Sequence, residues 1–447
     1  MTTQNASVKV HHVTRVEGHG NIVVDVKNGN VETCEWRVPE APRFFEAMVR
    51  GRHYSEVARI TSRICGICAV GHTLASVKAT ENALGMKISK QSDLLRRLLK
   101  HGENFDSHAV HVLFLIAPDL LSAPSVFPLV KTHPEVVKKA ILTKKLGCDW
   151  ASVISGRSTH PTKVIPGGFA SLPGEAYNAR MAEEELKKLK QSIIDIVPTV
   201  TDLYQLLGEL AVNIPDFTRE TEYVALVDDF EYGLYDGKIG CLMPDGSKQL
   251  IDVSEYKSVT NEWVSPLSTA KHCKHNMDSY MAGALARINH NYDQLHPEAV
   301  KIAEGLGFKA PCFNPYMNSV AQFIEMVHSA YISLGYIDQL LEMGIQDEKP
   351  VKPEKFGKGA GSTEVPRGIL FHEYEYDNDG FCISGNCIIP TNQNHANIQK
   401  DMDKLVPEMI EADKDEKAME LTLEMLVRAY DPCISCSTHY LDVTFKR

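Results

Sequence analysis

Residues 63–72 read Arg-Ile-Cys-Gly-Ile-Cys-Ala-Val-Gly-His, and residues 431–439 read Asp-Pro-Cys-Ile-Ser-Cys-Ser-Thr-His. In a Cys-x-x-Cys turn both sulfur atoms can point to one side and bind a metal, so two such turns that converge form a four-thiolate site. The expected ligands are Cys65, Cys68, Cys433 and Cys436. Four soft ligands suit zinc, nickel or iron, and the spacing does not choose among these metals.

Two other interpretations of the cysteines stay open at this point. A structural zinc site needs only four cysteines, but pairs in zinc ribbons usually lie about 15–20 residues apart, whereas 365 positions separate Cys68 from Cys433. A thioredoxin-like redox pair explains one motif at most. The other seven cysteines are scattered, which is typical of small buried residues.

Composition restricts the class of protein. A chain of 447 residues, 43% apolar and 23% charged, can form a large core in one to three domains. The net charge of −11 argues against a nucleic-acid partner. Residues 1–7 lack the features of a secretory signal, and the longest nearly apolar run, 109–121, is shorter than the roughly 20 residues of a membrane span. We therefore expect a cytoplasmic protein without a membrane span.

The hydrophobic pattern predicts a β-hairpin within residues 8–38, turning at Asn28-Gly29-Asn30. Helical spacing dominates the middle of the chain, with a β-rich insertion at 221–265, a linker at 349–361 and a strand-like passage at 365–390, before two helical stretches that reach Tyr430. The predicted helical stretches are 69–85, 92–116, 133–147, 174–210, 267–305 and 317–343. Neither a P-loop nor a Gly-x-Gly-x-x-Gly fingerprint occurs in the expected setting, so we do not expect this chain to hold NAD itself.

Three further motifs accompany the cysteine pairs: Arg-Val-Glu-Gly-His-Gly at 15–20, a segment from Ser107-His108 to Asp119, and Glu-Val-Pro-Arg-Gly at 364–368. Together the five motifs resemble the large, catalytic subunits of nickel–iron hydrogenases, in the family's order and over nearly the whole chain. The resemblance implies an α+β, mainly α fold with a central bundle of long helices and small α/β and β pieces.

The implied organisation is a single large-subunit domain over residues 1–447. Within it we distinguish a hairpin and first cysteine motif at 8–85, a helical body at 86–345 and a C-terminal α/β part with the second motif at 346–439. A tail, residues 440–447, follows.

The resemblance also implies how the cysteines divide two metals. Cys65 and Cys433 correspond to terminal nickel ligands, and Cys68 and Cys436 to thiolates that bridge nickel and iron. In the family the iron carries carbon monoxide and two cyanide ligands. Four thiolates bring a charge of about −4, which two divalent cations offset. Such a centre splits H2 heterolytically, and a terminal thiolate accepts the proton.

Other roles follow by position. Arg367 and Thr391 fit the hydrogen-bond donors to cyanide, while Leu370 and Pro390 would supply an apolar wall for carbon monoxide. Glu17 matches a glutamate that relays the proton from a thiolate toward solvent. The catalytic residues expected are thus Glu17, Arg367 and Cys433. The alternatives are that Glu17 and Arg367 are ordinary surface residues.

A surrounding shell is implied as well. Asp119 and Asp431 would anchor Arg367 and the neighbouring backbone. His72 would hydrogen-bond a cysteine sulfur, and Arg63 belongs to the same shell. The remaining site residues are three expected ligands of a structural magnesium ion: the carboxylate of Glu46, the side chain of His439 and the backbone carbonyl of Cys387. Alternatively, Glu46 lies on an ordinary helical face.

Partners follow from what the chain lacks. No further cysteine cluster suits iron–sulfur cofactors, so we expect a small subunit that carries them. The 166–168 Pro-Gly-Gly loop and the 364–370 segment look most like the cytosolic, multi-subunit group. There the electron acceptor is NAD(P), ferredoxin, a heterodisulfide reductase or a deazaflavin, reached through further subunits. A maturation endopeptidase would cleave after His439.

Two alternative functions belong to other classes. One is a nickel-free hydrogenase-like subunit of a redox complex, which the four retained cysteines argue against. The other is a zinc-stabilised scaffold.

Overall fold

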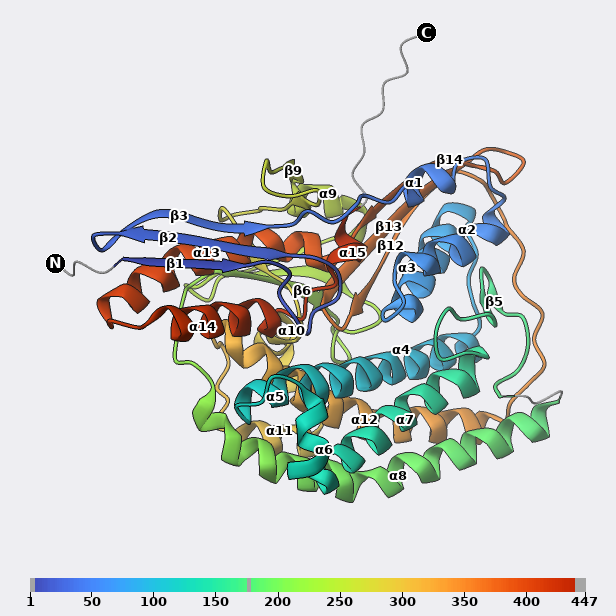
Figure 1. Cartoon of the computed structure of the whole chain (residues 1–447). Helices are drawn as coiled ribbons and strands as arrows, with labels where there is room; N and C mark the ends of the chain where they lie inside the picture. The colour runs from blue at the N-terminus through green and yellow to red at the C-terminus, as the bar shows by residue number, and fades with distance from the viewer. Residues whose placement is uncertain (1–4, 175–177, 439–447) are drawn as a thin grey trace, which may run out of the picture.

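The computed structural model describes residues 5–174 and 178–438. Near the N-terminus β1 (Ala6–Val10), β2 (Asn21–Lys27) and β3 (Asn30–Arg37) form an antiparallel sheet, and β1 and β2 bury alternate side chains. The turn between β2 and β3 contains Asn28 and Gly29, both with positive φ, which these residues tolerate. The predicted hairpin is therefore confirmed. The sheet lies over α13 (Pro390–Glu411) and α14 (Glu416–Ala429), so the two ends of the chain meet (Figure 1).

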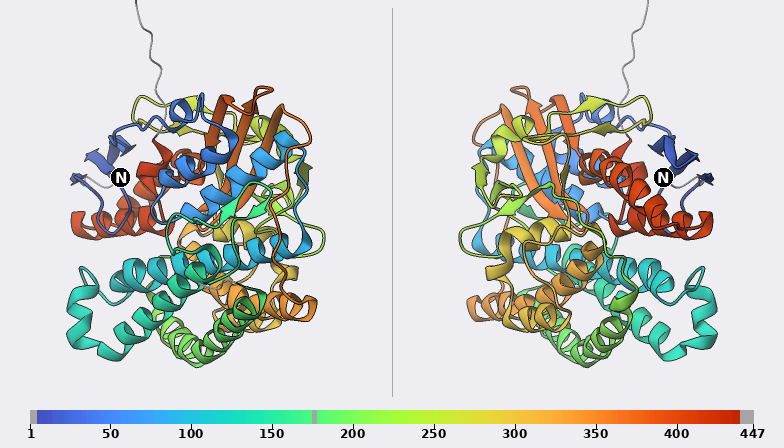
Figure 2. Two further views of the ribbon diagram at one scale, coloured as in Figure 1. Left: turned by 90° about the vertical axis from the view of Figure 1, so that its right-hand side faces the viewer. Right: turned by 90° about the vertical axis from the view of Figure 1, so that its left-hand side faces the viewer.

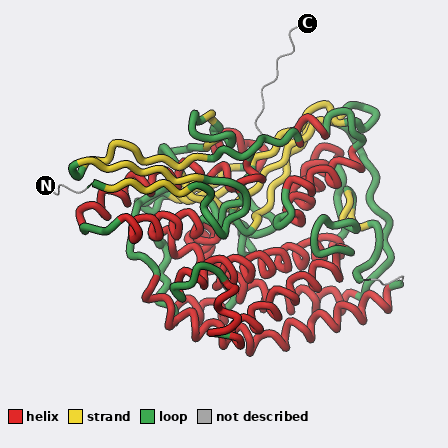
Figure 3. The backbone as a smooth tube through the Cα atoms, viewed as in Figure 1, coloured by secondary structure: helices red, strands yellow, loops and turns green. Residues whose placement is uncertain are grey.

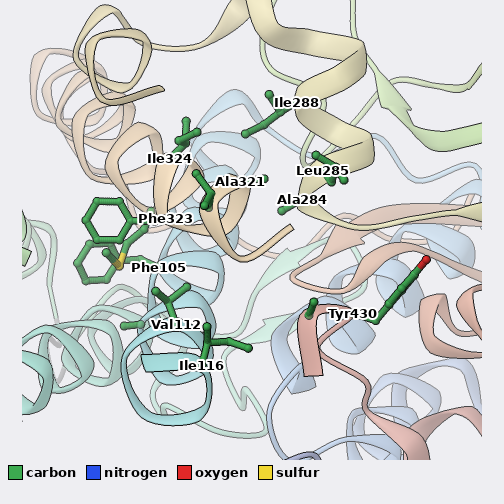
Figure 4. Close-up of a cluster of buried hydrophobic side chains, with 14 of the residues drawn as sticks. Phe105, Val112, Ile116, Ala284, Leu285, Ile288, Ala321, Phe323, Ile324 and Tyr430 are labelled. Carbon is green, nitrogen blue, oxygen red and sulfur yellow. The ribbon is translucent and has the colours of Figure 1, made fainter. Parts of the chain in front are cut away.

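Long helices form the opposite half of the molecule, as the red tubes of Figure 3 show. They are α4 (Lys90–Val110), α7 (Pro134–Ser155), α8 (Ala179–Leu210) and α12 (Asn318–Met343). A π-helical segment, His111–Ile116, continues α4 into α5 (Ala117–Leu120). Figure 4 shows Phe105 and Val112 of this continuous rod near Phe323 and Ile324 of α12, in the main core. The predicted central helix bundle is confirmed.

Shorter helices connect these layers. They are α1 (Phe45–Met48), α2 (Tyr54–Thr61), α3 (Ala69–Leu84), α6 (Val126–Thr132), α9 (Tyr256–Thr260), α10 (Ala284–Asn291), α11 (Pro297–Gly305) and α15 (Ile434–Ser437), with 3-10 turns at Ser62–Ile64, Ala211–Asn213, Val253–Glu255, Tyr292–Gln294 and Pro315–Met317. Within the described residues, no helix has the length and apolar character needed to cross a membrane.

Two sheets share a small core of their own. One is four-stranded, in the order β11 (Tyr280–Met281), β6 (Glu222–Val227), β7 (Lys238–Leu242) and β8 (Lys248–Ile251). The other is antiparallel and contains β12 (Lys358–Val365), β13 (Gly368–Tyr376) and β14 (Cys382–Ile388). Val224 and Ile239 of the first sheet pack in one cluster with Phe371 of the second. Figure 2 shows β12 to β14 side by side above the helices. The β-rich insertion and the later strand passage are confirmed.

Two predicted boundaries are wrong. Residues 267–283 do not continue the helical pattern: β10 (Lys271–His272) pairs with β9 (Trp263–Val264), and β11 adds parallel to β6. Helix α10 begins only after Gly283, whose φ of +133° suits glycine. The expected linker ends early, because pairing with β13 draws residues from Lys358 onward into β12. A last short hairpin joins β4 (Val164–Ile165) to β5 (Gly168–Phe169). The division of the domain into parts stays a prediction.

Candidate metal centre

The four cysteines of the two motifs meet in the interior. Cys65 follows a 3-10 turn and Cys68 precedes α3, while Cys433 precedes α15 and Cys436 lies within it. Their Sγ atoms all lie within 4.8 Å of one another. The Sγ atoms of Cys65 and Cys433 are 3.5 Å apart, and each of the four residues is at most 3% exposed. All four are free cysteines, so the predicted convergence of four thiols is present.

Burial and mutual hydrogen bonding set the protonation of these thiols. Burial opposes ionisation of Cys65, but hydrogen bonds from Cys433, Cys436 and Cys68 outweigh it and hold the pKa of Cys65 well below its ordinary value. Hydrogen bonds with Cys436, Cys65 and Cys68, followed by burial, raise the pKa of Cys433 well above its ordinary value. Bound cations would favour the thiolate form of a thiol such as Cys433.

The N-terminal loop closes one side of this cluster. The backbone N–H of Ile434 donates to the carbonyl of Glu17 at 2.9 Å, in a parallel bridge between Glu17 and Cys433. Gly18 makes the approach possible, because its φ is +83° and a Cβ there would lie 2.7 Å from the backbone nitrogen of Ser435. The sequence separation of these motifs gives no hint of this contact.

The half-buried carboxylate of Glu17 faces the second cysteine motif. Cys433 Sγ donates to Glu17 Oε2 at 3.2 Å. The backbone N–H of Ser435 donates to the same oxygen at 3.0 Å, and the Ser435 hydroxyl donates to Oε1. Glu17 thus connects a buried sulfur with the partly exposed rim of the site.

Arg367 lies on another side of the cluster, at the turn between β12 and β13. It is 3% exposed, and its Nη2 donates to Asp431 Oδ1 at 2.7 Å while Nη1 donates to Ser107 Oγ at 3.3 Å. Burial alone would lower the pKa of Arg367, but the negative charges of Asp431 and the cysteines outweigh burial and raise this pKa above its ordinary value. The guanidinium therefore stays charged. Its buried Nε has no hydrogen-bond partner among the described residues. An unpaired buried donor beside four thiols suits an anionic ligand.

The other residues expected near the iron also lie inside. Thr391 Oγ1 accepts the backbone N–H of Cys433 at 3.1 Å, which leaves its hydroxyl hydrogen to donate elsewhere. Leu370 and Pro390 are buried, and Leu370 packs in one cluster with the four cysteines.

Asp119 has different partners from those predicted. It accepts from Arg428 Nε at 2.7 Å and from Arg15 Nη2 at 2.5 Å, rather than from Arg367. Asp119 lies in α5, beyond the end of the π-helical segment, where Arg15 of the N-terminal loop and Arg428 of α14 both reach its carboxylate. Asp119 therefore supports Glu17 and Asp431 indirectly, through neighbours two and three residues away from them.

The other two residues predicted for the surrounding shell are Arg63 and His72. Arg63 is exposed, because the 3-10 turn buries its neighbours Ser62 and Ile64 instead. His72 is fully buried, and its Nδ1 hydrogen-bonds His372 Nε2 at 3.1 Å. Its charge contributes to the lowered pKa of Cys65. A direct bond from His72 to a sulfur stays a prediction.

The expected magnesium ligands are described only in part. Glu46 Oε1 accepts the backbone N–H of Cys387 at 2.8 Å, so these two residues are adjacent. His439 lies outside the described residues, as does the proposed cleavage point.

Comparison with known proteins identifies the class of site. The family model for nickel-dependent hydrogenases matches residues 43–141 and 243–439, and thereby both cysteine motifs. The chain belongs to the nickel-dependent hydrogenase family. A second family model, described as HoxL-like, matches residues 7–41.

Similar proteins match this hydrogenase chain over almost its whole length. It is 29% identical to the alpha chain of sulfhydrogenase 2 of Pyrococcus furiosus, over 97% of this chain and 99% of that one. The beta chain of the NAD-reducing hydrogenase HoxS of Cupriavidus necator is 27% identical over 96% of this chain and 94% of its own. An NAD+-reducing [NiFe]-hydrogenase in its H2-reduced state matches with a TM-score of 0.82 and 26% identity, over 98% of this chain and 100% of that structure.

The hydrogenase chain is thus an oxidoreductase with a nickel–iron centre, and the α+β, mainly helical fold is confirmed. The donor set fits the metals: four buried, unbridged sulfur atoms are soft ligands for nickel and iron. This result favours the hydrogenase interpretation over a nickel-free redox-complex protein or a zinc scaffold.

Sequence reasoning missed two residues of the hydrogenase site. Ser435 holds Glu17, and Arg43 Nη2 donates to the carbonyl of Ile64 at 2.6 Å and to that of Ser435, which joins the two motifs. Ser435 lies inside a motif and could have been found there. Arg43 gives no such signal.

A second group of ligand-type residues is Glu222, Cys241 and His275. The carboxylate of Glu222 already accepts from His275 Nδ1 at 2.7 Å and from two nitrogens of Asn276 at 3.0 and 3.1 Å. This group is accounted for as a polar network.

Proposed function

We propose that this hydrogenase chain holds nickel through Cys65 and Cys433 as terminal ligands, with Cys68 and Cys436 shared between nickel and iron. The observation that carries the proposal is the convergence of four buried Sγ atoms within 4.8 Å. Cleavage of H2 releases two protons and two electrons, and the nickel–iron centre, when bound, supplies the polarisation and the electron acceptance that this reaction requires. The protein residues bind that centre, exclude water and move the proton.

Proton transfer is the role of Cys433 and Glu17. The thiolate of Cys433 takes one proton, and Glu17 Oε2, at 3.2 Å from Sγ, accepts it next. Because Glu17 is half-buried whereas Cys433 is fully buried, the carboxylate can exchange the proton with solvent. Ser435 keeps the carboxylate oriented toward the sulfur through its N–H and hydroxyl groups.

Arg367 and Thr391 hold the iron side of the site. The unpaired Nε of Arg367 and the hydroxyl hydrogen of Thr391 are the donors that we assign to the two cyanide ligands. Asp431 keeps the guanidinium in place at 2.7 Å. Leu370 and Pro390 would form the apolar wall beside carbon monoxide.

Glu46 is the carboxylate that we assign to a magnesium ion, together with the carbonyl of Cys387 and the side chain of His439. The bond of 2.8 Å from the Cys387 N–H to Glu46 supports the first two, because it keeps them adjacent. The two oxygen donors, from Glu46 and Cys387, are of the kind that magnesium prefers, and water would complete the coordination.

The electrons require a partner that carries iron–sulfur clusters, and a small subunit of that kind is our proposal. Two relatives support a multi-subunit assembly, since one is the alpha subunit of a sulfhydrogenase and the other is the beta subunit of the NAD-reducing hydrogenase HoxS. We place the complex in the cytoplasm, with NAD(P), ferredoxin, a heterodisulfide reductase or a deazaflavin as the final acceptor. An endopeptidase would remove residues 440–447, and the intact mass of active protein tests this cleavage.

Metal analysis with infrared spectroscopy of the purified complex is the direct test. Nickel and iron together, with stretching bands of iron-bound carbon monoxide and cyanide, are the expected result. Zinc alone in fully matured complex, without those bands, would overturn the assignment. Replacing Cys65 by serine should abolish nickel retention, whereas the same change at the distant Cys34 should not.

A further inference from the structure

Arg287, on α10, uses every N–H of its guanidinium although it is fully buried. Nε and Nη2 donate to the two carboxylate oxygens of Glu325, each at 2.6 Å. Nη1 donates to Glu364 Oε2 at 2.8 Å and to the carbonyl of Val365 at 2.9 Å. Nη2 donates to the carbonyl of Pro366 at 3.0 Å. These five bonds satisfy the five donors of an arginine.

The last three acceptors belong to consecutive residues that lead directly to Arg367. Val365 pairs with Gly368 at the end of the β12–β13 hairpin, so Pro366 and Arg367 form its two-residue tip. Gly368 has a φ of +132°, and a Cβ there would lie 2.6 Å from the Cβ of Ala282. The tip therefore packs tightly on the segment before α10, and Arg287 holds the side of the tip that precedes Arg367.

Arg287 and its acceptors at the hairpin tip form a clamp, whose other end, Glu325, is fixed in the helical body. Glu325 lies on α12, and it also accepts from His108 Nε2 on α4 at 2.7 Å and from the Tyr232 hydroxyl at 2.6 Å. Figure 4 shows Leu285 and Ile288 of α10 near Ala321 and Ile324 of α12, so α10 is itself packed against that helix. Arg287 thus connects the hairpin tip to two long helices.

We propose that Arg287 is a positioning residue, which fixes the hairpin tip so that the guanidinium of Arg367 reaches the iron side of the four-cysteine site. The inference rests on the proposed role of Arg367 as a donor to cyanide. Among the described residues, the Arg367 side chain donates to Asp431 and Ser107, which do not hold its backbone, and its carbonyl accepts from Asn394 Nδ2 at 3.4 Å, on the side that follows Arg367. The backbone on the side preceding Arg367 is held by Arg287.

Lysine cannot replace arginine in this position. The five acceptor contacts diverge from one planar fork, whereas an ammonium group offers three donors from a single atom. Arg287→Lys keeps the positive charge between Glu325 and Glu364 but must release part of the tip. A displacement of about 1 Å at a catalytic group can cost on the order of 100-fold in rate. We expect kcat for H2 oxidation to fall by about 10- to 100-fold with little change in KM.

The test compares three variants in the complete complex, by metal content, kcat for H2 oxidation, thermal unfolding and infrared spectroscopy. Arg367→Lys removes the assigned donor itself and should shift the cyanide stretching bands. Arg287→Lys should shift or broaden the same bands while nickel and iron stay at wild-type levels. Arg96→Lys is the matched control: Arg96 is equally buried, binds Glu81 in a bidentate pair at 2.6 and 2.8 Å, and holds a different loop through the carbonyls of Ile165 and Gly168.

Arg96→Lys should lower the unfolding temperature and leave the cyanide bands unchanged. If Arg287→Lys behaves like Arg96→Lys, with wild-type bands and more than half of wild-type kcat, Arg287 is only structural and the inference is overturned. If Arg367→Lys also leaves the bands unchanged, the proposed role of Arg367 fails, and the inference fails with it. Should Arg287→Lys not assemble, Glu364→Gln removes one charged contact of the clamp, and a smaller shift in the same direction is then expected.

Discussion

Replacing Glu17 by glutamine tests the proposed proton transfer from Cys433 to Glu17. Glutamine has the shape of glutamate and can still accept the N–H of Ser435, so the loop that carries it should keep its conformation. It cannot take up a proton from Cys433 Sγ, which lies 3.2 Å from the carboxylate. Loss of a positioned proton acceptor typically costs about 10²- to 10⁴-fold in rate, or about 3–5 kcal/mol in the barrier.

The shorter acid gives a graded comparison. Glu17→Asp moves the carboxylate back by one carbon–carbon bond, roughly 1.5 Å, so the direct contact with Cys433 would need a bridging water. We expect its rate to lie between those of wild type and Glu17→Gln. Ser435→Ala is the matched control, because it removes a hydroxyl that contacts Glu17 but keeps the carboxylate. The exchange rate of Ser435→Ala should fall by less than about 10-fold, since one oriented hydrogen bond contributes about 1 kcal/mol.

The assay is the isotope exchange between D2 gas and the protons of the solvent. This exchange depends on proton delivery to the site but not on electron transfer to a partner. H2 oxidation with a viologen dye is measured in parallel. Nickel and iron contents and the infrared bands must match wild type in every variant. If Glu17→Gln with an intact metal centre retained more than half of the wild-type exchange rate, the proton would leave by another route, and the role assigned to Glu17 would be wrong.

Three further results are expected from the same geometry. Asp431→Asn removes the carboxylate that holds Arg367 and leaves a buried guanidinium unpaired, which should lower the free energy of unfolding by about 3–5 kcal/mol; an unchanged melting temperature would contradict this. Gly18→Ala should reduce nickel retention, because the added Cβ would lie 2.7 Å from the backbone nitrogen of Ser435. Gly51→Ala is the control: Gly51 also has a positive φ, but no atom lies within 4 Å of the added Cβ, so only the backbone strain of about 1–3 kcal/mol is expected. Burial lowers the pKa of His290 and of His328 from 6.5 to about 4, so between these pH values the unfolded chain binds more protons than the folded chain. The free energy of unfolding should therefore fall as the pH drops from 6.5 to 4, by about 3 kcal/mol for each residue. A falling unfolding temperature over this pH range measures the effect.

The sequence was most informative where the chemistry is local. A Cys-x-x-Cys turn places two sulfur atoms on one side whatever surrounds it, so the four ligands could be predicted before any tertiary contact was known. The partners of buried charged side chains could not be predicted, because these partners depend on which helices converge in the folded chain. Asp119 and Arg428 are 309 residues apart in the chain, and nothing in either segment indicates that they pair. The helix predicted for residues 267–283 was wrong for the same reason, since pairing of this segment with β6 and β9 outweighed its helix-like spacing.

Arg287 illustrates the limit of motif reasoning. It lies in a helix of ordinary appearance, and its acceptors are 38 to 79 residues away in the sequence. Its importance follows from three contacts to successive residues of the 364–368 motif, and this pattern exists only in the folded chain. A motif therefore indicates which side chain faces the site, whereas the residues that hold the motif must be found in the structure.

The two sides of the metal site are built differently, and the difference follows from what each must do. On the Cys433 side a half-buried carboxylate is held by a hydroxyl and one N–H, so it can exchange protons with solvent at little structural cost. On the Arg367 side a fully buried network of Arg287, Glu325 and Glu364 fixes the hairpin tip to long helices. A proton acceptor needs access to water, whereas a donor to ligands that remain on the iron needs a constant position. Water that reached the second network would compete for its donors and loosen the tip, so burial at Arg367 and exposure at Glu17 are both required by the proposed reaction.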